Sequence, residues 1–379
     1  MNISVILNSI CIHQYTCILP RAPMPSPVLT AKTRITLPDS AAIIARASDY
    51  YKSHDCDVQG DANAIRVSVS IGHVHLACND AGLDIEVGAT SDVGVIQMKS
   101  AIISLLQGAL PEANLDCRWK GAGKSNGKLP NFRELTVGKL TDLSPHMRRI
   151  RLHGADIAAY DTDSIHIRLL IPPRGQVAPK WPTLADNGMP VWPHGEDTIE
   201  QRIYTIRDIN AAAGWMDVDF VVHGDNGPGS SFAIHACTGD LIAMTGPLGN
   251  ELPDADWMLF AGDETALPAI GRYLNAMPPH VKGHAMIEVG SKDDIIDIAT
   301  DSAIEVRWLL RDCGDDVEHS LIQDAVRVIS IPKDAHSVYC WAGVEQDDYK
   351  PIHNFWRKDI GLTRDQCLAM TFWRKAGRG

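Results

Sequence analysis

The feature that most constrains the fold is a change in hydrophobic rhythm near residue 253. From there to the end, short apolar runs typical of strands alternate with helical patterns. That alternation predicts parallel βαβ units in an open sheet, because parallel strands need a crossover that a helix usually supplies. Residues 131–252 instead hold short strands separated by turns, interrupted by a long Pro- and Trp-containing loop at 172–195. This block predicts an antiparallel barrel.

The segments before the barrel have a different character. Residues 30–120 combine helical stretches with strands that alternate apolar and polar residues, which predicts a small α+β domain of unknown function. Residues 121–130 are rich in Gly, Ser and Pro and are interpreted as a linker. We interpret residues 1–29 as a disordered or mis-started extension, because no Lys or Arg precedes Arg21. The predicted domain boundaries are therefore 1–29, 30–120, 121–130, 131–252 and 253–379.

Charge and composition exclude several classes of protein. Lys and Arg number 35 against 47 Asp and Glu, a net charge of −12, which repels nucleic acid, so no nucleic-acid partner is expected. Polar residues interrupt the apolar N-terminal stretch before it reaches the roughly 20 residues of a membrane span, so none is expected. The nine cysteines are scattered without a C-x-x-C pair, which indicates no metal knuckle and favours a cytoplasmic protein. We expect a monomer or a weak dimer.

The first candidate site lies on the strand at 201–208. Arg202 and Tyr204 face one side of such a strand, and Thr205 and Arg207 face the other. An arginine fork suits phosphate oxygens, a tyrosine offers a flat face to a ring system, and a threonine can hydrogen-bond a ring nitrogen. From spacing alone, however, an exposed amphipathic strand with solubilising arginines is the favoured interpretation.

The second candidate site is a turn between a strand end and a short helix. The strand ends at His223, and Ser230 and Ser231 open the helix. Free N–H groups at a helix start bind anions, and Gly227 and Gly229 would let a phosphate approach closely. An ordinary loop with a serine N-cap is the alternative.

The third candidate site is the turn after an apolar strand that ends at Gly262. A helix follows near Thr265, the place where nucleotide phosphates bind in open α/β sheets. The turn is not a G-x-G-x-x-G motif, and Asp263 and Glu264 would repel a diphosphate. An N-cap role for Asp263 or Thr265 is the alternative.

Together these three segments resemble the siderophore-interacting protein family, the flavin-dependent ferric-siderophore reductases. Residues 202–207 are similar to the family's FAD strand, 223–230 to its second flavin segment and 261–270 to its nicotinamide-side turn. Residues 341–343 and 372–374 look like its last two landmarks. Three departures stand out: glycine at 229 where the family usually has alanine, phenylalanine at 232 where it has tryptophan, and a displaced acidic residue, Glu345.

The resemblance implies a ferredoxin-reductase-like fold, with an antiparallel FAD-binding barrel followed by a parallel α/β domain that binds NADPH or NADH. Arg202 would contact the FAD diphosphate, Tyr204 would pack against the ribityl chain or ring, and Thr205 would approach the flavin N5. Tyr204 and Thr205 are thus the expected catalytic residues. The expected cofactor-binding residues are Arg202, Tyr204, Thr205, Arg207, His223, Gly227, Gly229, Ser230, Ser231, Gly262 and Thr265.

The implied activity is electron transfer from NADPH or NADH through FAD to a ferric siderophore, with Fe(II) released in the cytosol. Such an enzyme needs no iron ligands of its own, since the siderophore holds the metal, and no metal site is expected. Arg148, Arg149 and Arg151 are candidates for a basic siderophore pocket, although a merely charged segment is the favoured interpretation. A generic NAD(P)H:flavin or quinone reductase and a non-catalytic siderophore-binding flavoprotein are the alternatives.

Overall fold

The computed structural model describes residues 28–375 except 38, 54–55, 70, 111–114, 116, 125–126, 186, 226, 250, 314–319 and 333–334. The extension predicted at 1–29 lies outside the described residues apart from its last two, as does part of the predicted linker. The contacts divide the chain into two compact units. The first comprises Met1–Phe132, Ala178–Ile199 and Ala243–Asn250, and the second Arg133–Val177, Glu200–Ile242 and Glu251–Gly379.

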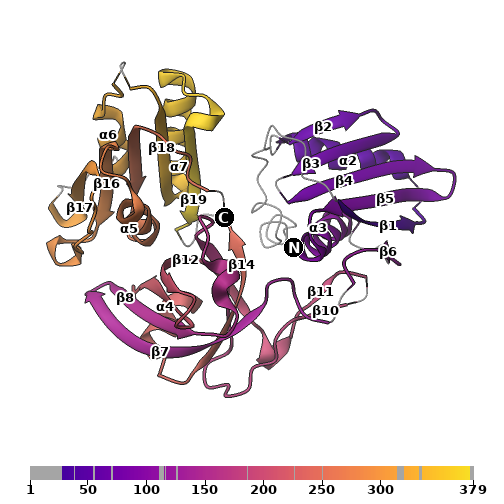
Figure 1. The fold of residues 1–379 in the computed structure, drawn as a ribbon, viewed down its shortest axis with the longest axis horizontal. Coiled ribbons are helices and arrows are strands. Elements are labelled where there is room, and N and C mark those ends of the chain that lie inside the picture. Colours follow the sequence, from indigo (N-terminus) through magenta and orange to yellow (C-terminus); the bar gives the residue numbers. More distant parts are fainter. Residues whose placement is uncertain are drawn as a thin grey trace. The chain divides into compact units, whose positions relative to one another are not determined.

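The first unit contains an antiparallel sheet of strand order β2-β3-β4-β5-β1-β6 (Figure 1, indigo to violet). Its strands are β1 (Leu29–Ile35), β2 (Asp57–Gly60), β3 (Ala64–Val69), β4 (Gly72–Asn79), β5 (Gly82–Ala89) and β6 (Lys120–Gly121). Helices α2 (Ser40–Ser53) and α3 (Asp92–Ala109) share one hydrophobic core with the inward residues of these strands. This is the α+β architecture that the sequence predicts.

Part of the long barrel loop also belongs to the first unit. Its hairpin of β10 (Thr183–Leu184) and β11 (Pro190–Val191) packs near α3. The Ser100 hydroxyl donates to the Gly188 carbonyl at 2.6 Å, and the Trp119 indole N–H donates to the Asn187 carbonyl at 2.8 Å. These long-range hydrogen bonds give the segment a structural role that the sequence does not predict.

The predicted antiparallel barrel is confirmed, with strand order β12-β13-β8-β7-β14-β9 around a closed sheet. Its strands are β7 (Arg133–Ser144), β8 (Met147–His153), β9 (His166–Ile171), β12 (Glu200–Asn210), β13 (Trp215–Val221) and β14 (Leu241–Leu248). A short helix, α4 (Pro228–His235), follows β13. Closure removes exposed strand edges and leaves the ends of the strands as places for a site.

The predicted C-terminal parallel sheet is also confirmed, with strand order β17-β16-β15-β18-β19 (Figure 1, orange to yellow). Its strands are β15 (Trp257–Gly262), β16 (Lys282–Val289), β17 (Ala303–Leu310), β18 (Val338–Glu345) and β19 (Cys367–Trp373). Alternate residues of β15 face opposite cores, so α5 (Leu267–Ala276) covers one face while α6 (Leu321–Val328) and α7 (Gln346–Asn354) cover the other. All these strands are parallel, and the order in which successive strands join the sheet reverses between β15 and β18, which creates a switch point of the kind where ligands bind.

Two observations bear on location. No helix in the described part of the chain is long and apolar enough to cross a membrane. Cys56 is disulfide-bonded, and such bonds are rare in reducing compartments, so the cytoplasmic location stays a prediction.

Candidate functional site

Strand β12 presents its predicted site residues in two directions. The Tyr204 ring packs on Phe220 of β13, with ring centroids 4.3 Å apart. The Thr205 hydroxyl instead lies 3.2 Å from Nδ1 of His166, which is its direct partner across the β9–β12 ladder. Burial raises the pKa of Tyr204, which keeps the phenol neutral. The strand therefore offers an aromatic face on one side and a buried hydroxyl on the other.

The start of α4 lies against Tyr204. A Cβ built on Gly229 would be 2.0 Å from the Tyr204 hydroxyl, so the tyrosine fills the space that an alanine side chain would need. This contact brings the helix start to the same end of the barrel as Tyr204. The structure thus juxtaposes the first two candidate sites.

The serines of the predicted phosphate loop bind the loop itself. The Ser230 hydroxyl accepts from the His223 N–H at 3.0 Å and donates to the Gly224 carbonyl at 2.6 Å. The Ser231 hydroxyl and His235 hydrogen-bond Asp225, which lowers the pKa of that carboxyl. What remains for an anion is the N–H groups of Gly229 and Ser230, because Pro228 has no N–H and the Ser231 N–H donates to the Gly227 carbonyl at 2.9 Å.

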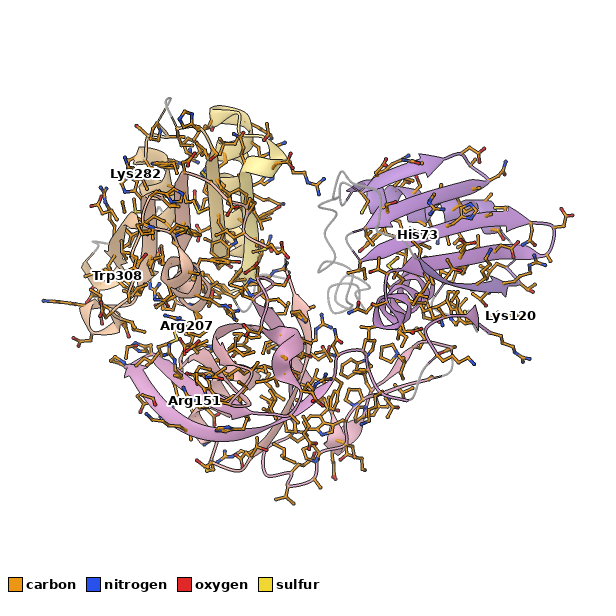
Figure 2. The ribbon with its side chains drawn as sticks, viewed as in Figure 1. His73, Lys120, Arg151, Arg207, Lys282 and Trp308 are labelled. Atoms are coloured by element: carbon orange, nitrogen blue, oxygen red, sulfur yellow. The ribbon has the colours of Figure 1, made fainter. Side chains whose placement is uncertain are left out.

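The two arginines of β12 differ in their surroundings. Arg202 is exposed, and its guanidinium donates to the Glu200 carboxylate at 3.1 Å and to the Gln201 carbonyl at 2.7 Å. Arg207, labelled in Figure 2, is half-buried, and a Cβ on Gly271 of α5 would lie 3.1 Å from its Nε. Burial lowers the pKa of Arg207. Only Arg202 therefore presents its guanidinium mainly to solvent. There a ligand phosphate can replace the Glu200 carboxylate as the partner of the guanidinium.

The third candidate site is a tightly bonded turn at the end of β15. The buried Asp263 carboxylate accepts from the Thr265 N–H at 2.8 Å, from the Thr265 hydroxyl at 2.6 Å and from the Trp373 indole at 2.6 Å. Burial raises the pKa of Asp263. Glu264 pairs with Arg311, which also binds the Glu288 carboxylate. Both acidic residues of the turn are thus engaged by the protein, which weakens their repulsion of a diphosphate.

Trp373→Phe is expected to destabilise the second unit. The change keeps an aromatic ring but removes the indole N–H, leaving one oxygen of the buried Asp263 carboxyl without its donor, at a cost of about 1–3 kcal/mol. Urea unfolding followed by circular dichroism measures the effect. The control is Trp308→Phe, which makes the same change at a partly buried tryptophan of β17 that packs on a hydrophobic core of the same sheet. Equal stability of the two variants would contradict the role given to Trp373.

Sequence reasoning missed two residues beside Thr205. His166 is 8% exposed, and its ring meets Phe372 of β19 edge-on at 5.7 Å. Arg272 of α5 donates to the Ile206 carbonyl at 2.7 Å, next to Thr205 in the strand. His166 is one of two polar residues, with Arg168, in a largely apolar strand, and this was the available signal. No comparable signal marks Arg272.

The basic residues of β8 do not form an open anion pocket. The guanidinium groups of Arg148, Arg149 and Arg151 each bind a carboxylate, at 2.6, 2.7 and 2.8 Å. Their partners are Asp142, Asp219 and Asp217. A cavity of about 350 Å³ beside the β7–β8 hairpin is lined by Asp142, Leu143, Ser144, Pro145, Met147, Arg148 and Val222. Two of these lining residues, Asp142 and Arg148, form an ion pair with each other. The structure therefore does not support a siderophore-binding role for the three arginines.

The donor set fits an FAD molecule. The first-turn N–H groups of α4 and the exposed Arg202 suit a diphosphate, and Tyr204 beside them suits a ring system or ribityl chain. No group of three or more His, Cys, Asp or Glu that could hold a metal ion occurs among the described residues. The site is therefore suited to bind an organic anion that carries an aromatic ring.

Two family models match the residues of the barrel and of the C-terminal sheet. The siderophore-interacting FAD-binding domain matches residues 136–251, and the siderophore-interacting protein model matches residues 255–376. The crystal structure of the siderophore-interacting protein SipS from Aeromonas hydrophila is 30% identical, with a TM-score of 0.55, covering 65% of this chain and 92% of that one. The chain belongs to the siderophore-interacting protein family. Its barrel is an FAD-binding domain, and FAD is its cofactor.

Two further relatives agree. A siderophore utilization protein from T. fusca is 30% identical with a TM-score of 0.54, covering 65% of this chain and 93% of its own. The ferric vibriobactin reductase ViuB of Vibrio cholerae is 29% identical over 237 residues, 62% of this chain and 86% of ViuB. Both family matches begin after residue 135, so neither includes the N-terminal α+β sheet.

Proposed function

We propose that this protein is an FAD-dependent oxidoreductase that passes electrons from NADPH or NADH to ferric siderophores in the cytoplasm, with release of Fe(II). The observation that carries the proposal is that Tyr204 packs against the start of α4, with Arg202 two residues before it in β12. Family membership and the name of the relative ViuB, a ferric vibriobactin reductase, support the same activity.

Each residue of the barrel site has a distinct task in this proposal. Arg202 and the first-turn N–H groups of α4 hold the diphosphate, and His223 borders that loop. Tyr204 packs against the ring or ribityl chain, and Thr205 has the role near the flavin N5 that the family resemblance implies. Bound FAD couples a two-electron donor to Fe(III), which accepts single electrons.

The nicotinamide nucleotide is proposed to bind at the Gly262 turn. This turn lies at the carboxyl end of β15, at the switch point between β15 and β18. The Thr265 hydroxyl is not free to bind the nucleotide, because it donates a hydrogen bond to the Asp263 carboxylate. The part of Thr265 is to hold the turn in shape, together with the N–H groups of Ala266 and Leu267, which both donate to the Asp263 carbonyl.

The substrate brings its own metal, so the proposed reaction requires no iron ligands from the protein. The oxygen ligands of a siderophore hold Fe(III) more tightly than Fe(II), so reduction frees the metal. The protein then needs only a surface for the chelate and the flavin edge beside it. Reduction of quinones instead of ferric chelates, or FAD binding without turnover, would be the outcomes that favour the alternatives.

Arg202→Ala is expected to weaken FAD binding by about tenfold, the loss of one charge-assisted hydrogen bond to phosphate. Fluorescence quenching of FAD during titration of FAD-free protein measures the dissociation constant. Arg307→Ala is the matched control, because Arg307 is an exposed arginine of β17 whose partner is Glu305. An Arg202 variant that binds FAD as well as the Arg307 variant would contradict the assignment.

A further inference from the structure

The Thr205 hydroxyl is fixed by the protein before any ligand is considered. Thr205 is 4% exposed and His166 is 8% exposed, and the Oγ1–Nδ1 distance is 3.2 Å. The antiparallel register of β9 and β12 places the two residues directly opposite each other. Cross-strand partners of this kind cannot separate without breaking the ladder. The pairing of the two strands therefore fixes the contact between Thr205 and His166.

His166 is itself held from the other side. Its ring meets Phe372 edge-on at 5.7 Å, and Phe372 meets Trp341 of β18 edge-on at 5.7 Å. Arg272 of α5 binds the Ile206 carbonyl immediately after Thr205. The hydroxyl of Thr205 thus lies at a junction between the barrel and the C-terminal sheet, with aromatic packing on the imidazole.

The imidazole is neutral at physiological pH. Burial, with the positive charge of Arg272 adding to it, lowers the pKa of His166 to about 4, while hydrogen bonding to the Tyr204 backbone opposes the shift. A neutral imidazole has one N–H and one bare nitrogen, so it can fix the rotation of a neighbouring hydroxyl. A threonine hydroxyl held in this way has a defined direction for its remaining hydrogen-bonding capacity.

We propose that His166 is a positioning residue that orients the Thr205 hydroxyl toward the place of the flavin N5. The proposal rests on the proposed function of β12 as the FAD strand. It makes His166 and Thr205 one functional pair, so that loss of either partner has the same consequence. Phe372 extends the pair to β19, and the C-terminal strand thereby supports the geometry of the barrel site.

The experiment compares His166→Leu, His166→Asn and Thr205→Val with the double variant His166→Leu/Thr205→Val. Leucine and valine keep approximate volume without the hydrogen bond, whereas asparagine keeps a polar atom near the position of Nδ1. We expect His166→Leu and Thr205→Val each to weaken FAD binding roughly fivefold and to shift the flavin absorption bands alike. The double variant should be no weaker than either single one, and His166→Asn should restore most of the affinity.

A second readout uses FAD-free protein. The urea midpoints of the same variants form a double-mutant cycle, and a coupled pair gives non-additive shifts. Additive shifts together with wild-type flavin bands in His166→Leu would overturn the proposal, even if Thr205→Val were impaired. If wild-type protein bound no FAD at all, the proposed function would fail, and the cycle would still decide whether the pair exists.

Discussion

Gly262→Ala is expected to destabilise the second unit by about 3 kcal/mol, the upper end for overpacking a buried site. A Cβ at this position would lie 2.4 Å from the Ala266 Cβ and 2.9 Å from the Gly343 carbonyl oxygen. Neither neighbour is the end of a flexible side chain, so α5 would have to move away from the sheet. Because this turn is the proposed nicotinamide site, reduction of bound FAD by NADPH should slow as well.

Two companion variants make the Gly262 result specific. Gly262→Ala/Ala266→Gly removes the closest contact and should recover part of the stability, leaving the Gly343 oxygen as the remaining conflict. Gly271→Ala, in α5, places its methyl 3.1 Å from the Arg207 guanidinium, which is the far end of a flexible side chain, and should cost little. Urea unfolding of all three variants measures the difference. A Gly262 variant as stable as the Gly271 variant would show that the turn is not tightly packed.

The stability of the protein should fall as pH drops from about 6.5 to 4 because of His166. The folded pKa of about 4 lies below the unfolded value near 6.5, so the unfolded chain binds the proton first. The stability that depends on a neutral His166 is therefore fully present above pH 6.5 and is lost progressively toward pH 4. The depressed pKa corresponds to about 3 kcal/mol over that window.

The measurement is the difference in unfolding free energy between wild type and His166→Asn at several pH values. Other groups titrate in the same range, since burial raises the pKa of Asp263 and of Glu288. Both variants share those carboxyls, so their contributions cancel in the difference, and Arg272 keeps its charge throughout. The account requires that the stability of wild type relative to His166→Asn decreases as pH falls, because only wild type carries the buried imidazole. A difference independent of pH would mean that His166 protonates without cost in the folded state.

Much of the fold of the second unit follows from sequence because its signals are local. The antiparallel barrel predicted for residues 131–252 is observed, because its short strands, such as β8 and β9, carry apolar residues at regular positions and are bounded by turns. The βαβ alternation after residue 253 likewise predicts the parallel sheet, and the family motifs point to the correct strands. Local periodicity is sufficient where neighbouring elements in sequence also pack together.

What sequence could not predict depends on contacts between distant segments. The partnership of His166 with Thr205 requires the register of β9 against β12, which 28 intervening residues of loop (172–199) separate. The hydrogen bonds that Trp119 and Ser100 donate to the carbonyls of Asn187 and Gly188 are equally non-local. The serine hydroxyls were expected at a phosphate, but their donors and acceptors in the loop could only be identified from three-dimensional geometry.

The most direct test of the proposed function is an anaerobic absorption experiment on purified, FAD-loaded protein. NADPH or NADH should bleach the flavin bands, and a ferric siderophore should then restore them while a ferrous-iron indicator reports about two Fe(II) per FAD. Flavin that is bleached by the nucleotide but not reoxidised by the ferric chelate would contradict the proposal and favour a generic reductase. A protein that cannot be loaded with FAD would contradict the assignment of β12 and α4 as its binding site.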